Sequence, residues 1–386
     1  MMTITQSLLG TLLLAATGSI AAEAPEAHEP IEIKDSEFDF VAGDSGDGST
    51  WVYHGSAPLK TVLDRPEGES EWWDGTVIRL LPGDSVMHEI PGEFVPGDRL
   101  FVGINAMQEG SGSSDEALRV NVRASDGWST NPARTIATGP NWRRGFAKFE
   151  FPVKWSRPGP CSVRFSNHGS APILLDKASV SRIVRDEEGF TSLFNGTDLE
   201  GWAGNTEGYG VEDGAIRTFP SRAGGNLYTA DQFDDFVFRF AFKVPPGANN
   251  GIAVRAPMGG DAAYQGMEFQ VLENSHPKYA GLKDWQFHGS IYGLAPALRG
   301  YLAPPGEWNH EEITVVGRKA RVVLNGKVIL EVDLDEVRKN GTLSGRDHPG
   351  ADRTAGHLGF CGHGDVVHFK DLRVRPVSGT KVPSGR

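Results

Sequence analysis

Short segments that alternate apolar and polar residues fill the chain, and apolar residues hardly ever recur at helical spacing. Alternation over four to eight residues is typical of half-buried β-strands. Turns rich in Gly, Pro, Ser and Asp separate the segments at the spacing of a β-sandwich. In the first half they are TWVYHG, TVIRL, SVMHEIP, DRLFVGINAM, ALRVNVRA, FAKFEFPV, CSVRFSN and PILLDKASVSRI. This pattern predicts one β-sandwich over residues 37–185.

A second series follows the charged stretch VRDEEGF, which places a domain boundary near Asp186. Asn325-Gly326 is a strong signal for a two-residue hairpin turn. The segments are AIRTF, DFVFRFAFKV, GIAVRA, MEFQVLEN, SIYGLA, EEITVVGRKARVVLNGKVILEVDL, HLGFCGHG and VVHFKDLRVRP. We therefore expect an all-β protein of two jelly-roll sandwiches, the second over residues 186–378, with a tail at 379–386.

The N-terminal residues follow the pattern of an export signal. Residues 8–16 are mostly apolar, and small residues lead up to Glu23, although the usual positive charge is missing. We expect a signal peptide over residues 1–22, a periplasmic or extracellular protein, and a linker over 23–36. A disordered or cytoplasmic N-terminus is the alternative. No other segment is long and apolar enough to span a bilayer.

The net charge limits which partners we expect, and the cysteine positions bear on whether a disulfide forms. Lys and Arg total 38 against 50 for Asp and Glu, a net charge of −12 without a basic cluster. Nucleic acid and anionic membranes are therefore not expected as partners. Cys161 and Cys361 fall in different predicted domains, so we expect two buried thiols, although export would permit a disulfide. The sequence leaves the oligomeric state open.

No metal or other cofactor is predicted. The spacing of Cys and His residues does not resemble a zinc site. The loop DSGDGS leaves a calcium ion open through Asp44 and Asp47, but it lacks the downstream Glu of a complete EF-hand loop.

Three segments of the second domain place polar or small residues on the face opposite to their apolar residues. If these segments are neighbours, the polar groups converge on one open surface. Such a surface suits a polyhydroxylated ligand, such as an oligosaccharide or glycoside. A solvated outer face is the simpler alternative. The outward set is Gly251, Ala253 and Arg255, then Glu268 and Gln270, then His288, Ser290 and Tyr292.

Residues 190–376 resemble the 3-keto-disaccharide hydrolase family. The resemblance rests on FTSLFNGTDLEGW, GVEDGAI, NNGIAVRA, MEFQVLEN, GSIYG, GEWN, VVLNGKVI and GHLGFCGHGDVVHFKDLRVRP, which occur in the family's order. It implies a concanavalin A-like lectin/glucanase fold with its site on the concave face. The first sandwich weakly resembles galactose-binding-like carbohydrate-binding domains, and a packing or spacer domain is the alternative.

The resemblance also implies site residues. The family's Asn-Ser-Gly turn falls on Asn249-Asn250-Gly251, where Asn250 departs from the pattern. Its Arg, its Glu-x-Gln pair and its Gly-x-x-Tyr fall on Arg255, on Glu268 and Gln270, and on Gly289 and Tyr292. Its Gly-Glu-Trp-Asn falls on 306–309. The substrate-binding candidates are Gln270, Asn249, Asn250, Trp308, Asn309 and, as an isolated feature, His363.

The implied substrates are glycosides oxidised at C3. A ketone there acidifies the C2 proton, so a base can remove it and the C1–O bond can break by elimination. Glu268 is the expected base and Arg255 the group that holds the enolate or ketone oxygen, while His288 or Tyr292 supplies a proton. Each of these residues could instead serve only in binding.

Two other functions stay open. The segment from Glu268 to Glu273 is similar to the Glu-x-Asp-x-x-Glu motif of laminarinase-type retaining glucanases, with Gln270 in place of the Asp. Those enzymes need two carboxylates about 5 Å apart. A secreted glycan-binding protein without catalysis is the other alternative.

Overall fold

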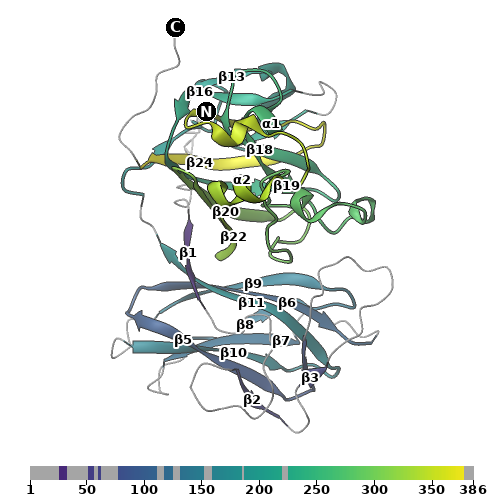
Figure 1. Ribbon diagram of the computed structural model, residues 1–386. Helices are drawn as coiled ribbons and strands as arrows, with labels where there is room; N and C mark the ends of the chain where they lie inside the picture. Colours follow the sequence, from purple (N-terminus) through teal and green to yellow (C-terminus); the bar gives the residue numbers. More distant parts are fainter. Residues whose placement is uncertain are drawn as a thin grey trace, which may run out of the picture.

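The computed structural model describes residues 26–32, 51–55, 60–61, 77–110, 117–124, 131–151, 159–184, 187–219 and 225–377. Nearly all regular structure there is β-strand, arranged in four sheets. The sheets form two sandwiches, one above the other in Figure 1, which confirms the predicted all-β class. The expected signal peptide, the calcium loop and the C-terminal tail lie outside the described residues.

The described residues contribute eleven strands to the first sandwich. Their bounds are β1 (Ala27–Ile31), β2 (Val52–His54), β3 (Lys60–Thr61), β4 (Val77–Leu80), β5 (Ser85–Phe94), β6 (Arg99–Gln108), β7 (Leu118–Ala124), β8 (Arg134–Ile136), β9 (Arg143–Glu150), β10 (Gly159–Asn167) and β11 (Ile173–Val184). One sheet has the order β3-β4-β11-β6-β9, with β1 also on β11, and the other has β2-β5-β10-β7-β8. Each of the eight predicted segments overlaps one of these strands.

The core of the first sandwich follows from alternation along its strands. On β10, Cys161, Val163 and Phe165 are buried, while the residues between them are partly exposed. They pack in one cluster with Val102 and Ile104 of the opposite sheet. Because side chains alternate between the two faces of a strand, one face of each sheet packs in the core.

In the described part of the second half, thirteen strands and several short helices build the second sandwich. The strands are β12 (Thr191–Ser192), β13 (Trp202–Gly204), β14 (Tyr209–Glu212), β15 (Ala215–Thr218), β16 (Leu227–Phe233), β17 (Phe236–Lys243), β18 (Asn249–Ala256), β19 (Met267–Leu272), β20 (Trp308–Val316), β21 (Lys319–Leu324), β22 (Lys327–Asp333), β23 (Gly356–Phe360) and β24 (His368–Pro376). The helices are α1 (Ala262–Gln265), α2 (Leu334–Asn340), η1 (Thr206–Gly208), η3 (Pro277–Tyr279), η4 (Asp284–Gln286) and η5 (Pro349–Asp352). None of these helices combines the length and apolar character that a bilayer crossing requires.

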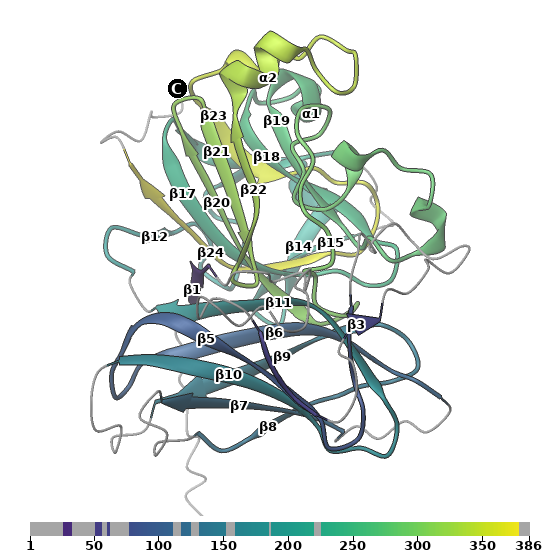
Figure 2. The ribbon, with the colours of Figure 1, turned by 60° about the horizontal axis from the view of Figure 1, so that its bottom comes forward.

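An eight-stranded and a five-stranded sheet face each other in this sandwich. The larger sheet has the order β14-β15-β24-β17-β20-β21-β22, with β12 on β24, and the smaller has β13-β16-β23-β18-β19. In Figure 2, β17, β20 and β21 of the larger sheet lie to the left of β18 and β19 of the smaller sheet. Every second residue of β17 is a buried phenylalanine: Phe236, Phe238, Phe240 and Phe242. The predicted hairpin is also confirmed, because Leu324 pairs with Lys327 around Asn325 (φ 48°) and Gly326 (φ 80°).

The structure corrects two predicted segments. Residues 27–31, expected within a linker, form β1, which pairs along its whole length with residues 180–184 of β11. SIYGLA, expected as a strand, is a turn that makes only isolated bridges through Ile291. Gly289 (φ 78°) and Gly293 (φ 76°) reverse the backbone there, which a continuous strand does not permit.

The two sandwiches touch along a seam that contains β1 (Figure 1). Arg144 of β9 donates to the Gly300 carbonyl at 3.5 Å and lies over the Tyr301 ring at 4.7 Å. Arg373 of β24 donates to the Glu26 carbonyl at 3.1 Å. The seam is therefore held by cationic side chains that reach across it. Cys161 and Cys361 are both free and buried, one in each sandwich, as expected.

Acid should weaken this seam. Burial lowers the pKa of His28, on β1, to about 3, with a further contribution from His310. In the unfolded chain His28 binds a proton as the pH falls through about 6.5, whereas in the folded chain it stays neutral there. Unfolding free energy should therefore fall by up to about 1.4 kcal/mol per pH unit below 6.5.

The measurement is urea unfolding between pH 7 and 5 in the presence of EDTA. His28→Gln should have a shallower pH slope than the parent protein. The control is His168→Gln, at an exposed histidine of the same sandwich. Equal slopes in all three proteins would contradict the assignment of this acid sensitivity to His28.

Candidate active site

Glu268 lies on the outer face of the five-stranded sheet. Its neighbours Met267 and Phe269 are fully buried in the core, so alternation turns Glu268 the other way. It pairs directly with Ala253 of β18, and Gln270 pairs with Gly251. The predicted orientation of Glu268 and Gln270 away from the core is confirmed.

Gly251 makes room for the Glu268 side chain. A Cβ atom at residue 251 would lie 2.0 Å from Glu268 Oε1, well inside van der Waals contact. The carboxylate therefore lies directly above β18, where a glycine allows close approach. Any side chain at residue 251 would displace this carboxylate.

His363 is the polar partner of Glu268. Its Nε2 lies 3.3 Å from Glu268 Oε1, and the hydrogen bond raises the pKa of His363 above its ordinary value. The side chain of Glu268 is 5% exposed, whereas that of His363 is 43% exposed. Asp365 adds a second negative charge near the imidazole. The pair thus joins a buried carboxylate to a histidine at the rim of the site.

Tyr292 lies beside Glu268 through the backbone. Its N–H donates to the Glu268 carbonyl at 2.9 Å, which places residues 288–292 along the free edge of β19. The phenol oxygen accepts from Gln286 Nε2 at 3.1 Å. The ring meets Trp285 edge-on, with centroids 4.8 Å apart. An aromatic wall therefore borders the outer face next to the carboxylate.

Two buried oxygens on this face lack a hydrogen-bond partner among the described residues. They are Gln270 Oε1 and Asn249 Oδ1. Asn249 lies two residues before Gly251 on β18, so both side chains leave the sheet on the Glu268 side. A buried acceptor without a partner costs free energy, and a sugar hydroxyl would satisfy it.

Sequence reasoning missed Cys361, Tyr228 and Asp261 around this carboxylate. Cys361 and Tyr228 pack with Ala253 in a small cluster on the outer face. Burial, together with the nearby Glu268 carboxylate, raises the pKa of the Cys361 thiol well above its ordinary value. Asp261 lies close enough to act electrostatically on both Tyr228 and Cys361. Cys361 lies two residues before His363 in the sequence, and this spacing could have placed Cys361 on the same face as His363.

The predicted outward position of Arg255 is wrong. β18 has an irregular register with β23 between Ala253 and Ala256, and Arg255 has φ 49°, so alternation breaks there. The residue is 1% exposed. Its guanidinium donates to the Asp235 carboxylate at 2.9 Å and to the carbonyls of Asp234 at 3.0 Å, Gly317 at 2.9 Å and Arg353 at 3.2 Å. Arg255 therefore ties loops together and does not face Glu268.

His288 also differs from the prediction, because it points between the two sheets. Its Nε2 lies 2.9 Å from Glu311 Oε2 of β20, and its ring lies 5.1 Å from that of Phe242. The turn that replaces the expected strand at 290–295 removes the alternation on which the prediction relied. His288 and Glu311 form a buried pair inside the sandwich.

Three of the predicted binding residues lie away from this face. Asn250 pairs with the core residue Val271, and its Oδ1 accepts from the Gly251 N–H at 2.9 Å. Asn309 Oδ1 accepts from Ala303 N at 2.7 Å and from Asn325 Nδ2 at 2.8 Å. Trp308 lies on the outside of the other sheet, between the ammonium groups of Lys243 and Lys370. Asn250 and Asn309 bind the chain's own backbone.

Glu273, the second carboxylate of the glucanase-like motif, belongs to a turn. Its Oε2 accepts from the Gly247 N–H at 2.8 Å, and its Oε1 accepts from the Ser275 N–H at 2.9 Å and from the Ser275 hydroxyl. Its oxygens are occupied by these bonds. Glu273 therefore does not offer a free nucleophile beside Glu268.

Residues 189–375 match the family model described as 3-keto-alpha-glucoside-1,2-lyase-like domain. The matched residues lie in the second sandwich, which we call the lyase-like domain from here on. A Bacteroides thetaiotaomicron protein named 3-keto-disaccharide hydrolase is 28% identical over 235 residues, which are 49% of this chain and 79% of the relative. The resemblance seen in the sequence is confirmed over this segment.

Solved structures also resemble part of this chain. Two crystal structures of candidate glycosyl hydrolases from Parabacteroides distasonis are 26% and 28% identical to the part that they match. They cover 50% and 49% of this chain and 95% and 99% of their own chains, each with a TM-score of 0.44.

Replacing Arg255 should affect stability and leave catalysis unchanged. Arg255→Met removes the guanidinium that pairs with Asp235 and donates to three carbonyls, so unfolding free energy should fall by about 3 kcal/mol or more. Urea unfolding measures this loss. The turnover number of the fraction that remains folded should equal that of the parent protein. A large fall in turnover without loss of stability would instead place Arg255 in the chemistry.

Proposed function

We propose that the lyase-like domain cleaves glycosides whose sugar carries a ketone at C3, by elimination across C1–C2 followed by hydration. The family description and the name of the Bacteroides relative support the substrate class. The observation that carries the proposal is the buried Glu268 carboxylate held 3.3 Å from His363 on the outer face. It puts a proton acceptor and a proton donor side by side.

Glu268 would act as the base. A ketone at C3 lowers the pKa of the C2–H bond, since the electron pair left behind is delocalised onto the ketone oxygen as an enolate. Glu268 lies directly above Gly251 and pairs with Ala253, so the small residues of β18 let the carboxylate lie close to the sheet on the proposed substrate side. The C2 proton moves to the carboxylate in this step.

His363 would supply the proton that the leaving oxygen needs. Its hydrogen bond to Glu268 raises its pKa, which favours the protonated imidazole. Its position at the rim suits contact with the departing alcohol. The enolate electrons form the C1–C2 double bond, the C1–O bond breaks, and the leaving oxygen takes the proton from His363.

Hydration would complete the reaction. Water adds its oxygen to C1 of the unsaturated ketone and loses a proton to His363, while C2 recovers a proton from Glu268. The products are the 3-keto sugar and the free alcohol, so the sum of the steps is hydrolysis. Both residues return to their starting protonation states, and the sequence of steps needs no other reactant than water.

Gln270 and Asn249 would orient the substrate. Each has a buried oxygen that no described residue hydrogen-bonds, and both lie on the same face as Glu268. Sugar hydroxyls are donors of the right kind for these oxygens. Tyr292 and Trp285 add aromatic surface at the border of the site, against which the apolar face of a sugar can pack.

Replacing Glu268 should abolish turnover and leave binding. Glu268→Gln keeps the shape of the side chain and removes the base, so kcat on a 4-nitrophenyl 3-keto-glucoside should fall about 100- to 10,000-fold. Release of nitrophenol measures turnover, and calorimetry measures binding of the 3-keto sugar. The matched control is Glu331→Gln, at an exposed glutamate on β22, which should retain full activity.

The parent protein should be inactive on the unoxidised glucoside, because that substrate lacks the acidified C2 proton. Equal activity on the oxidised and unoxidised glucosides would rule out elimination. Binding of 3-keto sugars without turnover in the parent protein would identify a binding protein in place of an enzyme.

The leaving group should reveal the role of His363. In His363→Gln, cleavage of a 3-keto-disaccharide should fall steeply, because its alkoxide needs a proton as the bond breaks. Cleavage of the nitrophenyl substrate should fall much less, because nitrophenolate leaves without protonation. The ratio of the two kcat values measures this difference. The same loss on both substrates would contradict a role as proton donor.

A further inference from the structure

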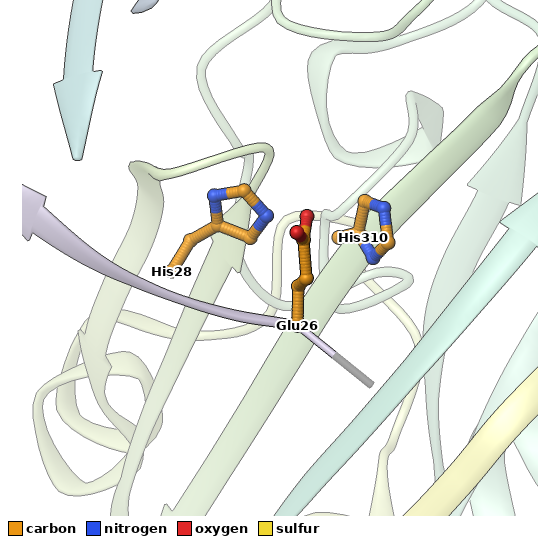
Figure 3. Close-up of side chains that lie close together, drawn as sticks. All are labelled: Glu26, His28 and His310. Carbon is orange, nitrogen blue, oxygen red and sulfur yellow. The ribbon is translucent and has the colours of Figure 1, made fainter. Parts of the chain in front are cut away.

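Three metal-binding side chains meet at the seam between the sandwiches. Glu26 directly precedes β1, His28 lies on β1, and His310 lies on β20 of the lyase-like domain. One ligand atom from each lies within 4.8 Å of the other two. Figure 3 shows the Glu26 carboxylate between the two imidazole rings. Residues so far apart along the chain form no recognisable spacing motif.

A small cavity adjoins these side chains. It has a volume of about 10 Å³, and Glu26, His28 and His310 are among the residues that line it. A space of about this size holds one water molecule or one ion. These three residues therefore border a space of the size that a single ion needs.

His28 presents an unused nitrogen there. The residue is 8% exposed, and its Nδ1 lies 3.2 Å from the Ser181 hydroxyl of β11. Its Nε2 is buried and has no hydrogen-bond partner among the described residues. With the Nδ1 proton donated to Ser181, the lone pair of Nε2 is free. Histidine ligands of metals commonly have such a second hydrogen bond.

We propose that Glu26, His28 and His310 bind one divalent transition-metal ion such as Zn²⁺. Two imidazoles and one carboxylate are a ligand set that zinc uses in proteins, with water in the fourth position. The carboxylate charge offsets part of the charge of the ion. The site lies on the opposite side of the core from Glu268, and it is separate from the proposed catalytic pair.

Two cations compete for the same carboxylate. Arg99 lies 2.6 Å from Glu26 Oε1, and Lys148 lies 2.5 Å from Glu26 Oε2. The Lys148 side chain is 47% exposed, so its ammonium can turn to water when an ion enters. Arg99 can keep its bond to the other oxygen. Lys148 is thus a competitor of the metal, and its removal should strengthen binding.

Cobalt binding tests the proposal directly. Full-length protein is treated with EDTA, dialysed and titrated with Co²⁺, whose visible absorption reports nitrogen and oxygen ligands. The parent protein should bind one equivalent, and Zn²⁺ should displace it. His310→Gln and His28→Gln should each weaken Co²⁺ binding by more than about 100-fold. Loss of a residue that only hydrogen-bonds a metal ligand costs up to about 100-fold, so a larger loss indicates loss of a ligand. Lys148→Met should bind more tightly than the parent protein.

The control is His168→Gln, at an exposed histidine outside the site, which should bind like the parent protein. Circular dichroism establishes that each variant is folded before titration. Zn²⁺ should also raise the unfolding temperature of the parent protein and leave that of His310→Gln unchanged. Absence of a Co²⁺ spectrum in the parent protein, or an equal spectrum in folded His310→Gln, would overturn the proposal.

Discussion

The alternation of β18 and β19 is the constraint on which the proposed chemistry depends. Ile252, Val254, Met267, Phe269 and Val271 all belong to one core, so a slip of one residue would bury Glu268 among phenylalanines. Burial of these apolar side chains thereby fixes the carboxylate on the outer face. Gly251 then determines how closely that carboxylate approaches the sheet.

Alternation also explains which features the sequence could predict. Glu268 and Gln270 were placed correctly, because β19 is regular over its six residues. Arg255 was placed wrongly, because one residue of left-handed backbone shifts the register of β18, and the local sequence carries no signal for that shift. His288 was also placed wrongly, because two glycines of positive φ convert its segment into a turn, where strand alternation does not apply.

Contacts between distant segments account for the rest. Nothing in the local pattern of residues 27–31 indicates that they complete a sheet, because their partner is a strand about 150 residues later in the chain. Cys361 and Tyr228 join the candidate site only because β23 lies between β16 and β18. Strand order of this kind depends on the whole topology and is poorly encoded in any one segment.

The pairing of β1 with β11 has a consequence for biogenesis. β1 leaves the ribosome about 150 residues before its hydrogen-bonding partners at residues 180–184. Until then the segment has no edge on which to dock, and closing so long a loop is entropically slow. The first sandwich can therefore complete its sheet only after β11 has been synthesised, shortly before synthesis of the second sandwich begins. Assembly of the seam is therefore a late event, which couples maturation of one half of the molecule to translation of the other.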